Sequence, residues 1–320
     1  MNESKRELER ISRLAATTAI VDRRQCLAGM TAVAAIGALP TTMWADDATT
    51  ASETASDKSS ALPAARFSFG LVTYQWGADW DLPTLIERCA AAKLSSVELR
   101  TTHRHGVEPA LDAAARKEVA RHFADSAVKL IGLGSDYRFD SPDAEVLAAN
   151  VEGTKAFLQL SHDVGASGVK VKPNDLPKNV PVERTIAQIG ATLNELGKFA
   201  ADLGQQVRLE VHGQCAKLPI IKQIVDLAEH KNVAICWNSN AEDLSGEGLA
   251  HNFALVRPRF GETLHVHELD SAEYPYAELF RLLRETNYAG HVLLEASSKP
   301  SDRAAALVEQ RKLFERLATN

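Results

Sequence analysis

The sequence predicts an α/β fold, a single-domain (β/α)8 TIM barrel over residues 67–320. Short β-rich runs alternate with amphipathic helical stretches, and eight such units fit within about 250 residues, the usual length of this barrel. The strand candidates are, in order, FGLVTYQW, SSVELR, KLIGLGSD, GVKVKP, VRLEVH, VAICWNS, TLHVHEL and HVLLEA. Helical patterns such as LPTLIERCAAAK, TIAQIGATLNELGKFAADLG and LPIIKQIVDLAEHK lie between them, and DRAAALVEQRKLFERLA follows the last strand.

The weakest part of this prediction is the helix between the sixth and seventh strands. It has to come from GEGLAHNFALVRPRF, which is short and contains Pro258. The alternative fold is a doubly wound sheet, which would carry a glycine-rich phosphate turn after an early strand. Neither GxGxxG nor GxxxxGK(S/T) occurs in the sequence, so the barrel is the better prediction.

The composition is that of a globular protein and argues against several functions. Of the 320 residues, 45% are hydrophobic and 24% are charged, and the net charge is -6. Lysines and arginines are dispersed, whereas nucleic-acid binding needs a concentrated basic surface, so no nucleic-acid partner is expected. The four cysteines have no CxxC spacing, which argues against a disulfide framework and a structural zinc site.

Residues 1–45 are predicted to be a twin-arginine export signal. Arg23 and Arg24 precede a short apolar run rich in Ala and Gly, which ends near Ala45. Residues 46–66 are mostly Ala, Ser, Thr and Asp without an apolar period, which predicts a flexible linker. We therefore expect a periplasmic protein with no membrane segment after cleavage. An uncleaved anchor is the alternative, although the apolar run is short for a membrane span.

Four of the predicted strands end in residues that can bind a metal ion. Side chains that point into a barrel meet at the carboxyl ends of the strands, where active sites of such barrels lie. The inward residues there are Glu210, Asn238, His267 and Glu295, spaced by 28, 29 and 28 residues. This ligand set suits one divalent cation, with Mn, Mg, Co and Zn all open. The alternative is a solvated barrel mouth whose polar groups bond to each other.

Two residues qualify this metal prediction. Asn238 is a neutral amide and a weaker ligand than a carboxylate, so the ion would bind less tightly or need an anionic substrate to complete its shell. His265 shares a strand face with His267 but lies one layer deeper, so we expect it to orient another group.

Six further residues are candidate substrate contacts near the same end of the barrel. They are Trp76, His103, His105, Lys170, Lys172 and His212. The two lysines point inward on the fourth strand and could hold an anionic group, and Trp76 could stack on a sugar face. The structural alternatives are solvated loop histidines, lysines paired with barrel carboxylates, and a tryptophan that packs at the rim.

At these residues the sequence resembles the xylose isomerase-like TIM-barrel superfamily, which contains sugar and sugar-phosphate isomerases and epimerases. The resemblance covers roughly residues 67 to 320 and rests on VELRTTHRHGV, LEVHG, CWNSN, HVHELD and LLEAS. Epimerases of this group hold a divalent metal with Glu, Asp, His and Glu from the last four strands. The resemblance implies these roles for Glu210, Asn238, His267 and Glu295. Two departures stand out: Asn238 replaces the Asp, and Ala241 stands where the family often has a His.

The resemblance implies proton transfer next to a carbonyl, with Glu210 and Glu295 as the catalytic pair and a metal-stabilised enediolate between the two steps. The expected function is isomerisation or epimerisation of a sugar or a related polyhydroxy carbonyl compound. One alternative is a non-catalytic barrel that binds a carbohydrate or a partner, its metal site degraded at Asn238. A less favoured alternative is an endonuclease IV-like phosphodiesterase. The sequence leaves the substrate open, and it leaves a homo-oligomer open.

Overall fold

The computed structural model describes residues 62–319 of the chain. The predicted export signal and most of the predicted linker lie outside the described residues. The last residues of that linker are described, and the carbonyl oxygens of Leu62 and Pro63 accept hydrogen bonds from the Arg284 guanidinium. Within the described part of the chain, no helix combines the length and the apolar character that crossing a membrane requires.

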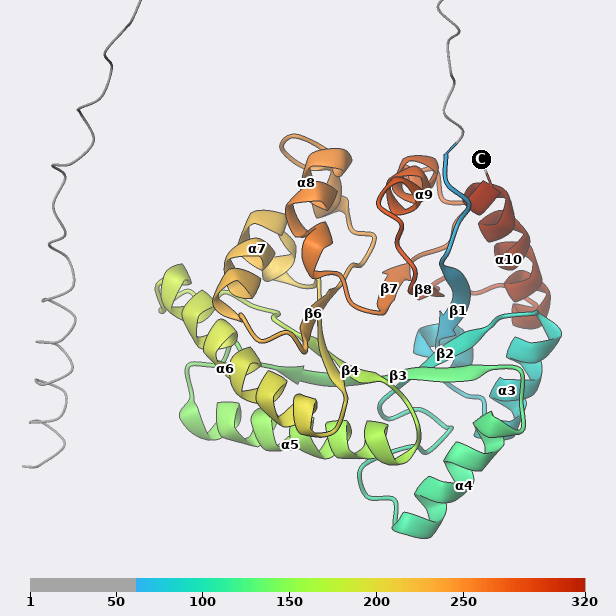
Figure 1. Ribbon diagram of the computed structural model, residues 1–320, viewed down its shortest axis with the longest axis horizontal. Coiled ribbons are helices and arrows are strands. Elements are labelled where there is room, and N and C mark those ends of the chain that lie inside the picture. Colours follow the sequence, from blue (N-terminus) through green and yellow to red (C-terminus); the bar gives the residue numbers. More distant parts are fainter. Residues whose placement is uncertain (1–61, 320) are drawn as a thin grey trace, which may run out of the picture. The chain divides into compact units, whose positions relative to one another are not determined.

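Eight parallel strands form the centre of the fold (Figure 1). They are β1 (Ser68–Val72), β2 (Ser96–Arg100), β3 (Lys129–Arg138), β4 (Gly168–Lys172), β5 (Gln206–Glu210), β6 (Val233–Cys236), β7 (Thr263–Val266) and β8 (His291–Leu294). β1 pairs with both β2 and β8, and isolated bridges join β6 to β7, where the His265 amide donates to the Trp237 carbonyl at 2.7 Å. The sheet thus closes on itself, which confirms the predicted (β/α)8 barrel.

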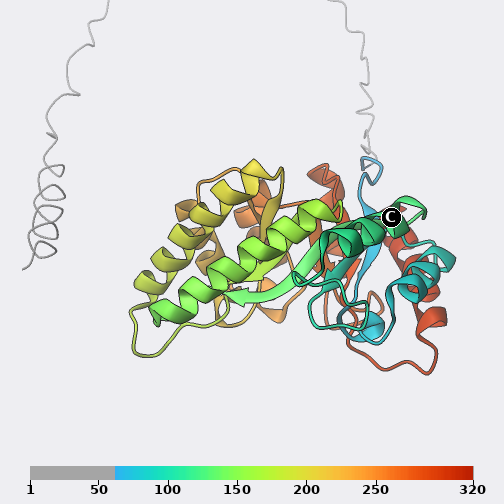
Figure 2. The same cartoon turned by 90° about the horizontal axis from the view of Figure 1, so that it is seen from below.

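The helices lie outside this ring of strands (Figures 1 and 2). They are α2 (Tyr74–Gly77), α3 (Leu82–Ala91), α4 (Ala113–Ala124), α5 (Ala144–Asp163), α6 (Val182–Asp202), α7 (Leu218–Leu227), α8 (Leu249–Val256), α9 (Tyr276–Glu285) and α10 (Arg303–Thr319). Three short 3-10 turns accompany them, at Gln214–Ala216, Ala241–Leu244 and Arg257–Arg259. The predicted helix between the sixth and seventh strands is therefore present as α8, and Pro258 lies in the turn that follows it.

Aspartates begin the first three long helices. The side chains of Asp81, Asp112 and Asp143 accept hydrogen bonds from backbone amides in the first turns of α3, α4 and α5. Each Asp has extended backbone angles, and its carboxylate satisfies amides that have no partner inside the helix. These caps therefore fix where each helix begins after the loops at the carboxyl ends of β1, β2 and β3.

The strands bury apolar residues toward the helices and polar residues toward the barrel axis. On β5, Val207 and Leu209 belong to the hydrophobic core, while the alternate residues Arg208 and Glu210 are equally buried inside the ring. Buried charges are retained only where partners compensate them. The interior of this barrel is therefore charged rather than apolar. The candidate site lies in this interior, at the carboxyl ends of the strands.

The first strand is shorter than the sequence predicts. It ends at Val72, and the chain turns into α2, so Tyr74 and Trp76 are helical rather than the end of a strand. Trp76 is 3% exposed, and its indole N–H donates to the Ser298 carbonyl at 2.8 Å. The ring packs in the rim and its polar atom has a partner, which favours the structural alternative for Trp76 over stacking on a substrate.

Candidate active site

Three buried side chains converge at the carboxyl ends of β5, β7 and β8. Glu210, His265 and Glu295 each offer one ligand atom, and these atoms lie within 4.8 Å of one another. The His265 Nδ1 is 3.4 Å from a carboxylate oxygen of Glu210 and 3.7 Å from one of Glu295. Neither nitrogen of this buried ring has a well-formed hydrogen bond to another described residue. Buried polar atoms without partners are uncommon and point to a ligand that completes them.

The histidine in this group is His265, not the predicted His267. The strand register pairs Glu210 with Cys236, Asn238 with His265, and His265 with Leu293. Because tilted barrel strands are staggered against one another, equal spacing along the sequence does not give equal height in the barrel. His265 therefore lies level with Asn238.

His267 lies beyond the end of β7, outside the cluster. Its Nδ1 faces the Glu295 backbone carbonyl oxygen at 3.1 Å, and its amide donates to the Ser239 hydroxyl. It lines a separate polar cavity of about 350 Å³ together with Ser239, Ala241, Glu268, Tyr276 and five other residues. The structure thus places His267 next to the cluster and separates it from the carboxylate oxygens.

Asn238 bridges the two carboxylates. Its Nδ2 donates to Glu210 and to Glu295, each at 3.1 Å, while its buried Oδ1 has no partner among the described residues. A half-turn of the amide exchanges the two atoms and would bring the oxygen to the carboxylates. Asn238 can therefore face this centre either as a donor or as an oxygen ligand.

Lys170 and Glu98 extend the cluster toward β4 and β2. The Lys170 ammonium is 3.0 Å from Glu210, and both side chains are at most 2% exposed. Glu98 is fully buried and lies 3.2 Å from the His265 Nε2. Three carboxylates, one ammonium and one imidazole thus share a small volume inside the barrel.

The buried cations keep these carboxylates ionised. Burial alone would raise the pKa of Glu210, but Lys170 and His265 outweigh it and hold that pKa well below its usual range. Burial and the Glu210 charge oppose ionisation of Glu295, and His265 and Lys170 still lower its pKa. Burial disfavours the Lys170 ammonium, yet the surrounding glutamates raise its pKa. The cluster is therefore a compact ionic centre rather than a set of neutral acids.

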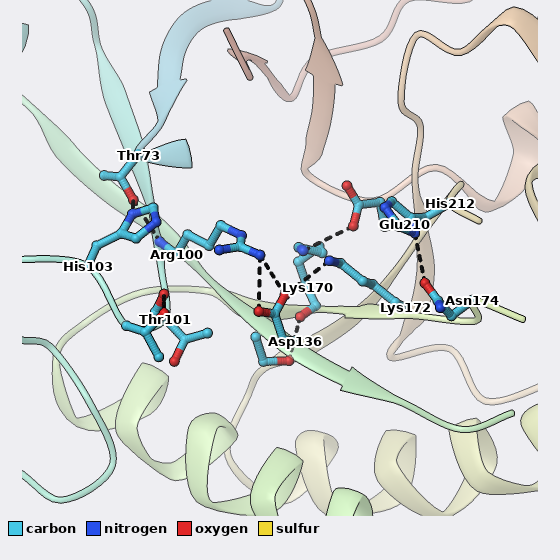
Figure 3. A network of polar contacts seen from close by, with 12 residues as sticks. Thr73, Arg100, Thr101, His103, Asp136, Lys170, Lys172, Asn174, Glu210 and His212 are labelled. Atoms are coloured by element: carbon cyan, nitrogen blue, oxygen red, sulfur yellow. Dashed lines mark hydrogen bonds and ion pairs between the residues drawn. The ribbon is translucent and has the colours of Figure 1, made fainter. Parts of the chain in front are cut away.

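A second polar group lies on the other side of the mouth, at the ends of β2, β3 and β4 (Figure 3). Arg100 makes two hydrogen bonds to the Asp136 carboxylate, at 2.9 and 3.0 Å, and Lys172 donates to the same carboxylate at 3.0 Å. Burial opposes the charge on Asp136, but Lys172 and Arg100 lower its pKa overall. We call these three residues the Arg100–Asp136–Lys172 triad.

Two histidines border the triad. The His103 ring lies 3.0 Å from the Thr73 hydroxyl, and the His212 ring lies 2.9 Å from the Asn174 side-chain oxygen (Figure 3). Burial and the Arg100 charge lower the pKa of His103 to about 4. Burial also lowers the pKa of His212, with Lys172 contributing. Both imidazoles are thus neutral near pH 7 and act as hydrogen-bonding groups.

His105, by contrast, supports the backbone. It is 8% exposed, its Nε2 lies 2.9 Å from the Arg100 carbonyl, and its Nδ1 accepts from the Val107 amide. Both ring nitrogens are occupied within the loop after β2. This arrangement favours a structural part for His105, which holds the segment that carries Arg100, over direct contact with a substrate.

Three residues of these two groups, Glu98, Arg100 and Asp136, were not predicted from the sequence, and His265 was predicted in a different role. Arg100 ends β2, Glu98 lies two residues earlier on the same strand, and Asp136 lies near the end of β3. Their alternation along β2 and β3 was the available signal, since Glu98 and Arg100 share a face of one strand. Placing His265 in the cluster required the register between strands.

Comparison with known proteins agrees with this architecture. The sequence model of the family described as xylose isomerase-like TIM barrel matches residues 86–317. Among solved structures, 3-keto-D-glucoside 4-epimerase, YcjR, from E. coli is 17% identical, with a TM-score of 0.66 over 79% of this chain and 100% of that one.

Two other solved structures are similar to the same extent. A D-psicose 3-epimerase crystallised in the presence of D-fructose is 18% identical, with a TM-score of 0.67 over 79% of this chain and 99% of that one. The IolI protein with a bound zinc atom is 15% identical, with a TM-score of 0.66 over 79% and 98%. At these identities the solved structures support the fold, and the match of the family model to most of the barrel supports the relationship. The chain belongs to the xylose isomerase-like TIM barrel family.

Proposed function

We propose that the protein is a sugar isomerase or epimerase that moves a proton next to the carbonyl of a polyhydroxy compound. The observation that supports this most is the pair of ionised, buried carboxylates, Glu210 and Glu295, held together by Asn238 and His265. The epimerases among the similar structures agree with this choice.

The cluster fits a divalent metal ion as cofactor. Glu210, His265 and Glu295 offer two oxygens and one nitrogen, a set that Mn²⁺, Co²⁺ and Zn²⁺ accept. The Asn238 oxygen is buried without a hydrogen-bond partner in the described residues. The His265 nitrogens face carboxylate oxygens at 3.2 to 3.7 Å without a well-formed hydrogen bond to them. These residues would hold the ion, with the Asn238 oxygen as a fourth ligand. The bound ion would supply Lewis-acid polarisation of a substrate carbonyl.

The side chains of this centre can perform the proton transfer. Glu210 comes from the end of β5 and Glu295 from the end of β8, with β6 and β7 between them. In the proposed reaction one carboxylate removes a proton from carbon and the other returns one from the opposite face. A carboxylate is a competent base only while ionised, and the low pKa of each group provides that state. Lys170 adds a fixed positive charge 3.0 Å from Glu210, which favours developing negative charge nearby.

A non-catalytic binding barrel is the competing function, and one observation favours it. In the described arrangement the Asn238 amide donates to one oxygen of each carboxylate, so a donor group stands where a metal ion would need an oxygen ligand. A barrel of this kind would bind a carbohydrate without exchanging its protons.

Deuterium exchange separates the two functions. The purified protein, with Mn²⁺, Co²⁺ or Zn²⁺ added, is incubated with a panel of ketoses in D2O, and proton NMR follows the C–H signals next to the carbonyl. We expect loss of such a signal for at least one sugar, absent in Glu295→Gln and retained in Glu262→Gln, whose carboxylate lies at the amino end of the barrel against Arg208. Binding of a sugar without exchange under every metal would support the non-catalytic barrel instead.

A further inference from the structure

The Arg100–Asp136–Lys172 triad has a surplus positive charge on the substrate side of the barrel. Two cations share one carboxylate, and that carboxylate is 47% exposed, whereas the Arg100 and Lys172 side chains are 19% and 16% exposed. The triad thus leaves one positive charge without a counter-ion among its own members. We propose that the substrate carries an anionic group, a carboxylate or a phosphate monoester, which binds at Arg100 and Lys172.

The two cations are held in place before any ligand arrives. The Arg100 guanidinium lies over the Tyr74 ring, 5.5 Å from its centroid, and is bonded twice to Asp136. Asp136 also aligns the Lys172 ammonium. A guanidinium and an ammonium fixed side by side form a site for an oxyanion, because charge-assisted hydrogen bonds to anionic oxygens are strong and little side-chain freedom is lost on binding.

The surrounding loops carry strained backbone, which is common at binding sites. Thr102 and Asn174 follow the strands that end in Arg100 and Lys172, and both have positive φ, 64° and 67°. Asn174 bridges to Gly213, where a Cβ atom would meet the Asn174 carbonyl oxygen at 2.6 Å. Strain of this kind persists where the neighbouring structure enforces it. The loops after β4 and β5 are thereby kept in one arrangement beside the triad.

The geometry connects the triad to the catalytic cluster. Lys170 and Lys172 are alternate residues of β4 and point to the same side, so their backbones are separated by about 6.6 Å along the strand. Lys170 contacts Glu210 in the cluster, and Lys172 contacts Asp136 in the triad (Figure 3). An anionic group at the triad therefore lies several carbon atoms away from the carbonyl that the cluster would process.

This proposal rests on the proposed function and narrows its substrate class. D-Psicose, named for one of the similar structures, is a sugar without an ionisable acid group. An acidic or phosphorylated polyhydroxy carbonyl compound is instead expected here. The imidazoles of His103 and His212, which border the triad, are placed to contact hydroxyl groups between the two ends.

Binding of three matched ketoses tests the proposal. D-Fructose, D-fructose 6-phosphate and D-fructuronate differ only at the carbon farthest from the carbonyl, and calorimetry on the metal-free protein measures their dissociation constants without turnover. We expect at least one of the two anions to bind about tenfold or more tightly than D-fructose. Preference for only one anion identifies the group as phosphate or carboxylate, and preference for both assigns the shared anionic chemistry.

Variants show whether the triad causes the preference. Arg100→Met and Lys172→Met should reduce the ratio of affinities to about one, whereas Lys172→Arg should retain it and Asp136→Asn should increase it. Lys178→Met, a change of an exposed lysine in the loop after β4, should leave the ratio unchanged. Circular dichroism melting identifies any variant that fails to fold.

Two results would overturn the proposal: equal affinity for the three ketoses, or a preference that survives both Met variants. Neither result bears on deuterium exchange, because binding is measured here without turnover. The substrate proposal can therefore fail while the isomerase proposal stands, and the reverse also holds.

Discussion

The two sides of the barrel mouth use charge in opposite ways. On the β5–β8 side, Glu210 and Glu295 are buried and share His265 and Lys170 as counter-charges. On the β2–β4 side, the Arg100–Asp136–Lys172 triad is partly exposed and carries one cation more than it has carboxylates. One side is thus an enclosed acidic centre, and the other is an accessible basic one.

We expect the buried β5–β8 side to perform the chemistry and the partly exposed β2–β4 side to recognise the substrate. Charges in a buried cluster interact strongly and are screened little, which suits a centre that has to hold ionised carboxylates and move protons. Partly exposed charges contribute less energy each but remain available to a ligand that enters from solvent. If the comparison is right, changes on the acidic side abolish turnover or stability, and changes on the basic side alter substrate preference and pH response.

The largest effect is expected from Glu295→Gln and Glu210→Gln. Each change keeps the shape of the side chain and removes the base, so the rate of deuterium exchange or turnover should fall about 100- to 10,000-fold. The measurement is kcat, compared with that of Glu262→Gln at the opposite end of the barrel. A rate within threefold of wild type would remove these residues from the catalytic role, since such a loss is too small for a general base (about 100-fold at least).

The metal content of two histidine variants tests which histidine binds the ion on the β5–β8 side. His265→Ala removes the nitrogen that faces both carboxylates, whereas His267→Ala removes a ring that lies in a separate cavity. We expect bound divalent metal, measured by mass spectrometry after dialysis, to be lost in the first variant and retained in the second. Loss in His267→Ala alone would return the ligand role to the residue that the sequence predicts.

These two histidines also illustrate what sequence reasoning could reach. The barrel follows from patterns inside each strand and helix, because apolar alternation on β5 or the aspartate cap of α3 depends on nearby residues alone. Glu210 and Glu295 could be placed in the same way, as inward residues at strand ends. Choosing between His265 and His267 requires the stagger between strands, which is a property of the closed sheet.

The basic side was harder to predict from sequence for a related reason. Lys172 was identifiable on the inward face of its strand, but its partners Arg100 and Asp136 come from two other strands. Trp76 shows the converse, because its strand ended earlier than the β-rich run implies and the ring became buried in α2. The partners of Lys172 and the end of the first strand are set by contacts between segments far apart in the sequence, which patterns within one segment do not reveal.

The buried ion pair between Lys170 and Glu210 provides a test of stability. Lys170→Met keeps most of the side-chain volume but leaves the Glu210 carboxylate without its closest cation, so we expect a loss of about 3–5 kcal/mol in the free energy of unfolding. Urea unfolding measures it. Adding Glu210→Gln to Lys170→Met should recover part of the loss, because the unpaired charge is then gone.

Lys222→Met is the matched control for that experiment. Lys222 also pairs with a carboxylate, that of Asp226, but the pair lies exposed on α7 and is expected to contribute little. Similar losses in both lysine variants would mean that the acidic centre is not electrostatically enclosed, and the contrast between the two sides would disappear.

The smallest effect concerns the pH response of His103 on the basic side. Its folded-state pKa of about 4 lies below the ordinary value of 6.5, because burial and Arg100 disfavour the charged ring. As the pH falls from about 6.5 to 4, the unfolded chain binds this proton first, so the protein loses stability in that window. His103→Gln removes one such group and should make the fall in unfolding free energy between pH 7 and pH 5 less steep. An unchanged slope in His103→Gln would mean that burial and Arg100 do not lower the pKa of this ring in the folded protein.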